Sequence, residues 1–376
     1  VEQVLGLGIV GYGHFGEFTG DLYAHIPGVR IAGVVDSDTQ RRQLAASHLG
    51  ARAYEHIAEL LLDPSIDIVV LNTPPWLHGQ QALAAARAGK HLFIEKPMAT
   101  SNEEADELVR LAAERNLQIS VDYVMRHVPL YDRLRALVDS ELFGAITHIA
   151  LKNNASNEAL GPDHWFWDHA KSGGILVEHG VHFFDLCSQL TGSQANSVTG
   201  YGHTEADGRQ DRVLAAVRYA NGILGMFYHA FDRRAIVERT VLHVTFERGS
   251  AAAYGWIPER LEIEGIVTPD TKEKLAALLG TTLTTEERAA PPGVPGGTDG
   301  MIGHTILMRP DRTADYAAAV RAGMEDVIRA IREPGQPPQV TAENGRASLQ
   351  LALAAQQAID SGIAVAIPLP DLDARC

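Results

Sequence analysis

The chain has 376 residues, of which 45% are hydrophobic and 21% charged, a composition typical of a globular protein with an ample core and two domains. Its formal net charge of −15 argues against a nucleic-acid-binding surface. The cysteines, Cys187 and Cys376, are too few for a cysteine-based metal centre and favour a reducing compartment. No window reaches the length of a membrane span and no signal-peptide pattern precedes the first strand, so a cytoplasmic location is expected.

A glycine-rich turn follows the first expected strand, residues 4–10. Gly11, Gly13 and Gly16 fall in the pattern G-x-G-x-x-G, and residues 18–26 then have helical spacing. The first glycine permits the tight turn, the second lets a pyrophosphate approach the backbone, and the third lets helix and strand pack closely. Strand, turn and helix in this order predict a dinucleotide site at the helix N-terminus. A glycine turn in some other α/β unit is the alternative.

A second strand, residues 29–35, ends in Asp36, which lies 36 − 16 = 20 residues after the last glycine. An acidic residue is expected there to bind a ribose hydroxyl of the cofactor. Because a carboxylate repels a 2′-phosphate, Asp36 favours NAD over NADP. Arg41 and Arg42 follow closely in the sequence and weaken this preference.

Strands and helices continue to alternate through the first third of the chain. The expected helices cover residues 39–49, 57–62 and 79–88, and a fourth runs from a cap at Ser101 or Asn102 to residue 114. The expected strands are residues 51–54, 66–71, 91–94 and 118–121. This alternation predicts a parallel, doubly wound α/β sheet, which binds ligands beyond the carboxyl ends of its strands. The chemistry-bearing segments at those ends are residues 11–16, Asp36, residues 73–78, Lys96 and residues 123–126.

The pattern changes after about Pro129. A helix at 131–138 is followed by strands without intervening helices, expected at 146–152, 197–203, 212–219, 222–229, 237–247, 250–256 and 260–266. Asn221-Gly222 is a strong hairpin signal. We therefore expect two domains, residues 1–125 and 126–376, the second with a large, mainly antiparallel sheet. Residues 265–310 are expected to be irregular, with a loop at 291–297, and residues 314–332 and 342–361 form two closing helices.

The motif Glu95-Lys96-Pro97 ends one of the parallel strands. A lysine fixed there points into the ligand crevice and can stabilise a developing alkoxide or polarise a carbonyl. A surface lysine before a proline turn is the alternative.

Residues 172–185 are expected to form a helix opened by small residues. Glu178, His182 and Asp185 then share one face, and a carboxylate one turn away raises the basicity of the imidazole, which suits a general base. An incidental salt bridge on an amphipathic helix is the alternative. A metal site at His179 and His182 ranks well below the general base, because no third ligand stands out, so no metal is expected.

Aromatic and acidic side chains gather just upstream, in Asp163-His164-Trp165-Phe166-Trp167-Asp168. An indole can stack on the C–H face of a pyranose ring while a carboxylate binds its hydroxyls. Trp165, Trp167 and Asp168 are therefore candidates for substrate binding, and core packing is the alternative for at least one of the tryptophans.

With these residues assembled, the chain resembles the Gfo/Idh/MocA family of NAD(P)-dependent oxidoreductases, the relatives of glucose–fructose oxidoreductase and inositol dehydrogenase. The matching motifs occur in order over nearly the whole length. They are Gly11–Gly16, Thr73-Pro74-Pro75 with His78, Glu95-Lys96-Pro97, Tyr123 with Arg126, residues 173–185 and residues 340–345. The resemblance implies a Rossmann domain followed by an α/β domain whose open sheet serves in homodimers or homotetramers.

The resemblance also implies a mechanism, reversible hydride transfer between the nicotinamide and a sugar or polyol hydroxyl. Lys96 and His182 would be catalytic, with Glu178 standing where the family most often has Asp. The implied cofactor-binding residues are Gly11, Tyr12, Gly13, His14, Phe15, Gly16, Asp36, Arg41, Thr73, Pro74, His78, Glu95 and Lys96. The implied substrate-binding residues are Lys96, Tyr123, Arg126, Trp165, Trp167, Asp168, His179 and His182. The alternatives are a redox-neutral, NAD-dependent glycoside-cleaving enzyme and a non-catalytic NAD(P)-binding regulator.

Overall fold

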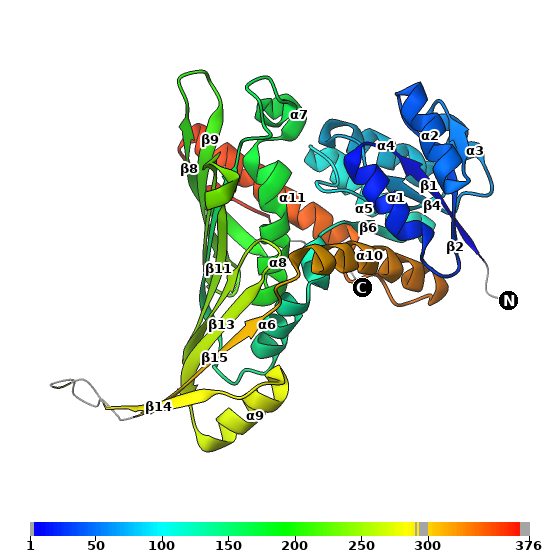
Figure 1. Ribbon diagram of the computed structural model, residues 1–376. Helices are drawn as coiled ribbons and strands as arrows, with labels where there is room; N and C mark the ends of the chain where they lie inside the picture. The colour runs from blue at the N-terminus through cyan, green and yellow to red at the C-terminus, as the bar shows by residue number, and fades with distance from the viewer. Residues whose placement is uncertain (1–3, 290–291, 293–299, 369–376) are drawn as a thin grey trace. The chain divides into compact units, whose positions relative to one another are not determined.

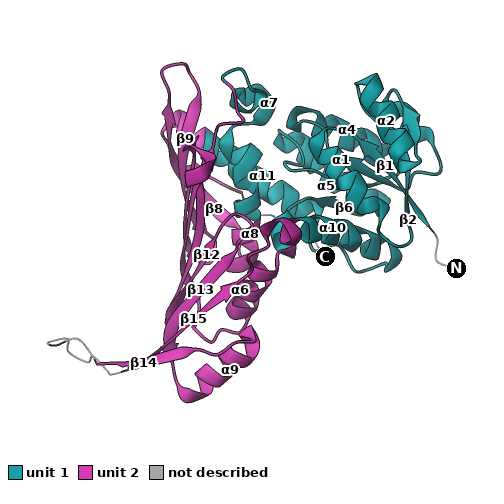
Figure 2. Ribbon diagram, in the orientation of Figure 1, with its two compact units in different colours: residues 1–126, 162–185, 317–356 teal, residues 127–161, 186–316, 357–376 magenta. Residues whose placement is uncertain are grey.

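Two β-sheets organise the chain (Figure 1). The computed structural model describes residues 4–289, 292 and 300–368. Grouped by contacts, they fall into two compact units (Figure 2). Unit 1 comprises residues 1–126, 162–185 and 317–356, and unit 2 comprises residues 127–161, 186–316 and 357–376. The expected division at residue 125 stays a prediction, because each compact unit draws on several separate segments.

Unit 1 contains a six-stranded parallel sheet, in the order β3-β2-β1-β4-β5-β6. Its strands are β1 (Leu5–Val10), β2 (Val29–Val35), β3 (Arg52–Tyr54), β4 (Ile68–Leu71), β5 (His91–Ile94) and β6 (Ile119–Val121). The order reverses at β1, as in a doubly wound sheet, whose ligand crevice lies outside the strand ends at this point. The predicted Rossmann-type sheet is confirmed.

The crossover helices of this sheet are α1 (His14–Ala24), α2 (Thr39–Leu49), α3 (Ile57–Leu62), α4 (Pro75–Arg87) and α5 (Asn102–Arg115). Asp38 caps α2 by accepting a hydrogen bond from the Arg41 N–H (2.9 Å), and Ser101 caps α5 by accepting one from the Glu104 N–H (3.3 Å). Helix α4 begins four residues earlier than expected, because Pro75 is well tolerated in a first helical turn.

Unit 2 contains a ten-stranded sheet, in the order β14-β15-β13-β12-β11-β7-β10-β9-β8-β16. Only the pairing of β7 with β10 is parallel among those described, so the expectation of a mainly antiparallel sheet is confirmed. Its strands begin with β7 (Ile146–Ser156), β8 (Ala195–Thr204), β9 (Gln210–Tyr219), β10 (Leu224–Arg233), β11 (Arg239–Phe246), β12 (Gly249–Tyr254) and β13 (Arg260–Val267). The Asn-Gly signal is also confirmed, since Gly222 has φ +90° in the turn from β9 to β10.

The expectation of irregular structure over residues 265–310 is wrong. The segment contains α9 (Pro269–Leu279), β14 (Thr284–Arg288) and β15 (Gly300–Met308). The strand β14 is short and largely polar, so it lacks the alternation that would have revealed it. It is held by pairing with β15, which in turn pairs with β13. The loop expected at 291–297 lies outside the described residues, except for residue 292.

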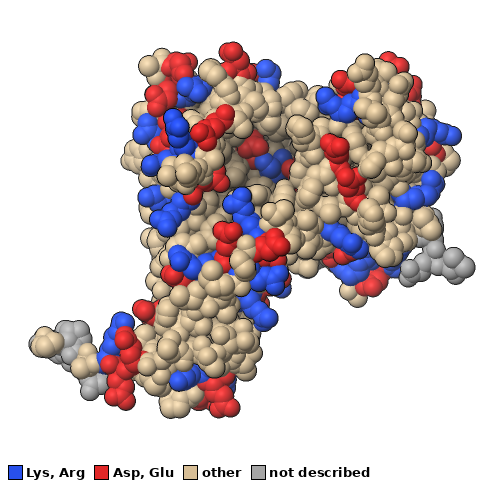
Figure 3. Space-filling model, in the orientation of Figure 1, with Lys and Arg blue, Asp and Glu red and all other residues tan. Residues whose placement is uncertain are grey.

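The remaining helices connect or cover these sheets. They are α6 (Pro129–Asp139), α7 (His169–Ser172), α8 (Val181–Thr191), α10 (Arg312–Arg332) and α11 (Ala342–Ser361), with the short strand β16 (Val365–Ala366). Within the described ranges, every helix is too short or too polar to cross a membrane. On the face shown in Figure 3, acidic and basic side chains are interspersed.

Candidate functional site

The glycine turn between β1 and α1 has the geometry of a phosphate cradle. Gly11 has φ +88°, and a Cβ there would lie 2.9 Å from the backbone of Asn72. A Cβ on Gly16 would lie 2.2 Å from the oxygen of Gly11, whereas nothing lies within 4 Å of a Cβ placed on Gly13. Gly11 and Gly16 are therefore required for packing, and Gly13 leaves open space above a helix start that no side chain caps. These residues fit a dinucleotide.

A pocket with a volume of about 330 Å³ adjoins this turn, lined by Tyr12, Gly13, His14, Glu17, Arg41 and Leu44. Asp36, only 6% exposed, contacts two residues of this lining, Tyr12 and Arg41. Its carboxylate accepts hydrogen bonds from the N–H groups of Tyr12 (2.7 Å) and Asp38 (2.8 Å), and Arg41 lies 3.6 Å away. The backbone thus fixes Asp36 beside the pocket. Of the predicted cofactor residues in this turn, Phe15 is not part of the lining; its ring lies 6.0 Å from that of Phe18.

The segment after β4 braces the lysine motif. Thr73 donates a hydrogen bond to Gln81 (2.6 Å), and Pro74 is the N-cap of α4. His78 is 1% exposed, with Nε2 2.5 Å from the Thr73 oxygen and Nδ1 2.7 Å from the Pro97 oxygen. Burial lowers the pKa of His78. This ring therefore links the end of β4 to the end of β5.

Lys96 follows β5 and reaches the segment that precedes α8. Its Nζ lies 2.7 Å from Oε1 of Glu178 and 2.9 Å from the backbone oxygen of the same residue. The two side chains are 16% and 14% exposed. Burial opposes the charge on Lys96, but the attraction of Glu178 and Glu95 outweighs it and raises the lysine pKa. Lys96 is therefore a fixed cation at a strand end, and its predicted role in the reaction stays a prediction.

Glu178 lies in a π-helical turn, Leu176–Gly180, that leads into α8. The sequence predicts a regular helix here and misses this turn, which adds about one residue to the helical repeat. Single π-helical turns in α-helices are frequent at functional sites.

His182 and His179 are packed in the same region. Their ring centroids lie 6.3 Å apart, and the ring of His182 meets that of Tyr123 edge-on at 6.0 Å. Burial, then the charge of Lys96, holds the pKa of His182 well below its usual range and lowers that of His179 to about 3. The expectation that a carboxylate raises the basicity of His182 is therefore wrong in direction.

Both carboxylates expected to assist His182 are engaged elsewhere. Glu178 pairs with Lys96, and Asp185 accepts two hydrogen bonds from Arg126, at 2.7 Å from Nε and 2.6 Å from Nη2. A further Nη1 hydrogen bond from Arg126 reaches the oxygen of Gln339 (2.8 Å). The side chains of Arg126 and Asp185 are 8% and 2% exposed. Arg126 thus joins the segment that follows β6 to α8, and its predicted role in substrate binding stays a prediction.

The aromatic segment before α7 forms a cluster of rings, and the predicted role of Trp165, Trp167 and Asp168 in substrate binding stays a prediction. Trp165 meets Trp76 edge-on at 5.6 Å, while Trp167 packs on the buried Phe166 at 4.9 Å. Asp168 caps α7 by accepting a hydrogen bond from the Ala170 N–H (3.0 Å). Trp76 lies in the first turn of α4, which was missed because the expected helix began only at residue 79.

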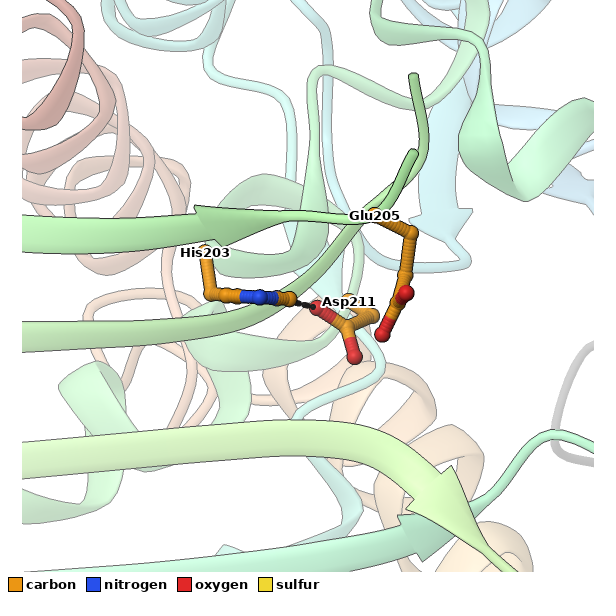
Figure 4. A group of neighbouring side chains, drawn as sticks. All are labelled: His203, Glu205 and Asp211. Atoms are coloured by element: carbon orange, nitrogen blue, oxygen red, sulfur yellow. Dashed lines mark hydrogen bonds and ion pairs between the residues drawn. The ribbon is translucent and has the colours of Figure 1, made fainter. Parts of the chain in front are cut away.

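Three side chains of types that can bind a metal ion lie together in unit 2. They are distant in the sequence from the site residues described above. His203, Glu205 and Asp211 place one ligand atom each within 4.8 Å of one another (Figure 4). The guanidinium of Arg212 already lies 2.8 Å from Nδ1 of His203, 3.1 Å from Asp211 and 3.4 Å from Glu205. The positive charge in this cluster is therefore an arginine, and the group is an ion-pair network.

Comparison with known proteins identifies the family. The model of an oxidoreductase family with an NAD-binding Rossmann fold, GFO_IDH_MocA, matches residues 5–123, and the model of the GFO/IDH/MocA C-terminal domain matches residues 131–252. Together they cover most of the chain.

Several named proteins are similar. The scyllo-inositol 2-dehydrogenase (NAD(+)) of Bacillus subtilis is 30% identical over 59% of this chain and 64% of its own length. The 2,7-anhydro-N-acetylneuraminate hydratase of Mediterraneibacter gnavus is 28% identical over 63% of this chain and 66% of its own length. Each alignment thus spans under two thirds of the relative.

The fold has solved counterparts. The WlbA dehydrogenase from Bordetella pertussis, in complex with NADH and UDP-GlcNAcA, superposes with a TM-score of 0.80 at 21% identity, over 98% of this chain and 99% of that one. This likeness concerns the fold. From the two family models, the chain belongs to the Gfo/Idh/MocA family of oxidoreductases, with residues 5–123 as its NAD-binding Rossmann domain.

Proposed function

We propose that this protein is an NAD-dependent dehydrogenase or reductase that acts on a hydroxyl group of a sugar, inositol, anhydrosugar or glycoside. The observation that carries the proposal is the Lys96–Glu178 pair at the end of β5, whose side chains are 16% and 14% exposed, in the same unit as the buried imidazole of His182. A fixed cation together with a neutral base is what oxidation of an alcohol requires. The scyllo-inositol and UDP-GlcNAcA of the named relatives support a carbohydrate-like substrate.

The residues around the glycine turn would hold the cofactor. Gly11, Gly13 and Gly16 cradle the pyrophosphate, and Asp36 beside the pocket takes a ribose hydroxyl. When bound, NAD supplies the hydride acceptor for the carbinol carbon. The carboxylate of Asp36 disfavours a 2′-phosphate, so NAD is preferred to NADP.

Lys96 and His182 would act on the substrate oxygen. Two of the three N–H groups of Lys96 are directed at Glu178 within the described structure, which leaves the third for that oxygen. The lysine cation stabilises negative charge on the oxygen as its proton leaves. His182 is neutral at physiological pH, because burial lowers its pKa, and it can accept that proton. Glu178 keeps the lysine in place.

Formation of NADH, followed by its absorbance, tests the proposal across a panel of sugars, inositols, anhydrosugars and glycosides, with NAD and NADP in parallel. Reduction of NAD by one class of substrate, abolished in Lys96→Ala, is the expected result. If no substrate of the panel produced NADH and the purified protein retained bound NAD, the result would instead support the second candidate below.

The second candidate is a redox-neutral enzyme that uses NAD transiently to cleave or hydrate its substrate. The relative named a 2,7-anhydro-N-acetylneuraminate hydratase favours it, because that name describes no net oxidation. Product formation without NADH accumulation would distinguish this candidate. A purely regulatory role is disfavoured by the retention of both Lys96 and His182, since a sensor needs no proton-transfer pair.

We further propose that the protein works as a homodimer or homotetramer in the cytoplasm. One face of the ten-stranded sheet carries exposed apolar side chains on β10 and β15, Leu224, Met226, Ile306 and Met308, which are 43–58% exposed. The register across β7, β11, β12 and β13 places Met226 and Ile306 in one row, hence on one face. Met226→Glu should lower the mass measured by light scattering, whereas Ile236→Glu, outside the sheet, should not.

A further inference from the structure

Two carboxyl groups meet behind Lys96. Strands β5 and β6 pair in parallel with Ile94 opposite Val121, and the N–H of Asp122 donates to the oxygen of Ile94 (2.8 Å). Glu95 and Asp122 are therefore the next pair in register, immediately beyond both strand ends. Their side chains lie within hydrogen-bonding reach of each other. Asp122 is not among the site residues predicted from the sequence.

The surroundings of Asp122 do not suit a carboxylate anion. Asp122 is 3% exposed, and its Oδ1 is buried with no hydrogen-bond partner among the described residues. The cation whose charge acts on Asp122 is Lys96, and its ammonium donates to Glu178 instead. A buried, ionised carboxylate without donors is costly, whereas a protonated one can donate to a neighbouring carboxylate.

The charges around the pair lead to the same conclusion. The charged groups facing it are Lys96, which follows β5, and Glu178 of the π-helical turn. If Glu95, Asp122 and Glu178 were all ionised, three negative charges would surround one positive charge at a largely shielded site, where Asp122 is 3% exposed and Lys96 and Glu178 are 16% and 14% exposed. One proton held between Glu95 and Asp122 lowers that excess, as in other pairs of carboxyl groups that share a site.

We propose that Glu95 and Asp122 share one proton at neutral pH and that Asp122 is thereby a positioning residue for Lys96. The shared proton limits the negative charge next to the lysine, so that the ammonium remains able to stabilise negative charge on a substrate oxygen. Burial raises the pKa of both carboxyl groups, that of Glu95 to about 7, in agreement with this assignment. Loss of the shared proton at alkaline pH should weaken the stabilisation by Lys96. The link to turnover rests on the proposed function, but the shared proton does not.

Infrared spectroscopy of the full chain, without NAD or substrate, tests the shared proton directly. The wild type should show the C=O stretch of a protonated carboxyl group at pH 7 that disappears at higher pH. Asp122→Asn and Glu95→Gln should each lose this signal, and Asp67→Asn, a control at a carboxylate that accepts a hydrogen bond from the Gly6 N–H (2.7 Å), should retain it. A wild-type spectrum with no protonated carboxyl group at pH 7 would overturn the proposal.

Stability gives a second, independent readout. A carboxyl group with a raised pKa binds its proton more tightly in the folded state, so its contribution to stability is lost as pH rises from the unfolded pKa towards the folded one. The difference in urea midpoint between wild type and Asp122→Asn should therefore change between pH 5 and pH 8, with the wild type losing more stability. If the urea midpoints of the two proteins changed equally between pH 5 and pH 8, the proposal would be contradicted.

The role in positioning Lys96 requires an enzymatic readout. In Asp122→Asn, an amide N–H that donates to Glu95 takes the place of the shared proton, whereas Asp122→Ala leaves Glu95 without this donor. This variant should therefore recover much of the turnover lost in Asp122→Ala at pH 7, and it should lack the alkaline decline of the wild type. Equal loss in both variants with an unchanged pH profile would rule out the positioning role. If no substrate is found, the infrared measurement still decides whether the proton is shared.

Discussion

The ammonium of Lys96 is bound twice by one residue, at 2.7 Å by the carboxylate of Glu178 and at 2.9 Å by its backbone oxygen. Because the second contact involves the backbone, it depends on the conformation of the π-helical turn as well as on the side chain. The lysine side chain is therefore held in one position before a substrate binds. This is the property of a preorganised electrostatic group.

Replacing Lys96 should abolish turnover without abolishing cofactor binding. Removal of one preorganised donor typically costs about 10²–10³ in rate, so Lys96→Ala should lose at least that much kcat. The cofactor cradle lies in another part of unit 1, so the Kd for NAD, measured by fluorescence quenching, should change little. Lys274→Ala, at an exposed ion pair with Asp270, is the matched control and should keep full activity. Wild-type kcat in Lys96→Ala would remove the lysine from the mechanism.

His182→Ala should also lose turnover, by about 10²–10⁴ as expected for a general base. The measurement is kcat with saturating substrate and NAD. His148→Ala serves as a control histidine in unit 2. Retention of wild-type kcat in His182→Ala would show that the substrate proton leaves by another route.

The low pKa of His179 should make the protein less stable in acid. Since this pKa is about 3 in the folded state and about 6.5 when unfolded, the unfolded chain binds the extra proton first as pH falls. The contribution is complete above pH 6.5 and is lost progressively below it, to an extent of a few kcal/mol near pH 4. Urea unfolding at pH 7 and pH 4.5 should show a smaller loss for His179→Gln than for the wild type. An equal loss in both would contradict this assignment.

Replacing Asp36 should change the choice of cofactor. Asp36→Ser removes the charge that repels a 2′-phosphate, while Arg41 at 3.6 Å remains to attract it. The ratio of kcat/KM for NADP over NAD should rise by about tenfold or more, which corresponds to about 1.4 kcal/mol. Arg41→Ala in the Asp36→Ser background should reverse part of this gain. An unchanged ratio in Asp36→Ser would mean that another residue sets the preference.

The pair of Arg126 and Asp185 should be a major source of stability. Breaking a buried ion pair by removing one partner typically costs about 3–5 kcal/mol, because the remaining charge is left uncompensated. Asp185→Asn should therefore lower the free energy of unfolding by a few kcal/mol. A double-mutant cycle with Arg126→Met measures the coupling, and it should exceed 1 kcal/mol. Additive effects would show that the two side chains act independently.

The periodic parts of the fold could be predicted, since helices α2 and α3 and strands β2 and β5 have the expected bounds. Strands β2 and β5 are runs of mostly apolar residues, and α2 begins after a capping residue, Asp38. Such signals lie within a few residues of the element that they predict. The strand β14 could not be found this way, because its residues are polar and only pairing with β15 specifies it.

The candidate site was predictable as a set of residues but not as a set of contacts. Lys96 and Glu178 were both identified, yet 82 residues separate them, and no local pattern shows that they form an ion pair. Asp122 was missed for the same reason, since its significance comes from the neighbouring strand. The direction of the His182 pKa was also out of reach, because burial decides it and burial depends on the whole fold.

The π-helical turn at Leu176–Gly180 changes the rotational phase of Glu178 relative to α8. Glu178 lies within the turn and Asp185 lies one to two turns beyond it, and each is anchored to a different cation. Deleting one residue from the turn would restore a single helical phase, so that one of the two anchors would have to release. The extra residue thus sets the angle between Glu178 and Asp185 around the helix axis. It allows one continuous segment to bind both Lys96 and Arg126.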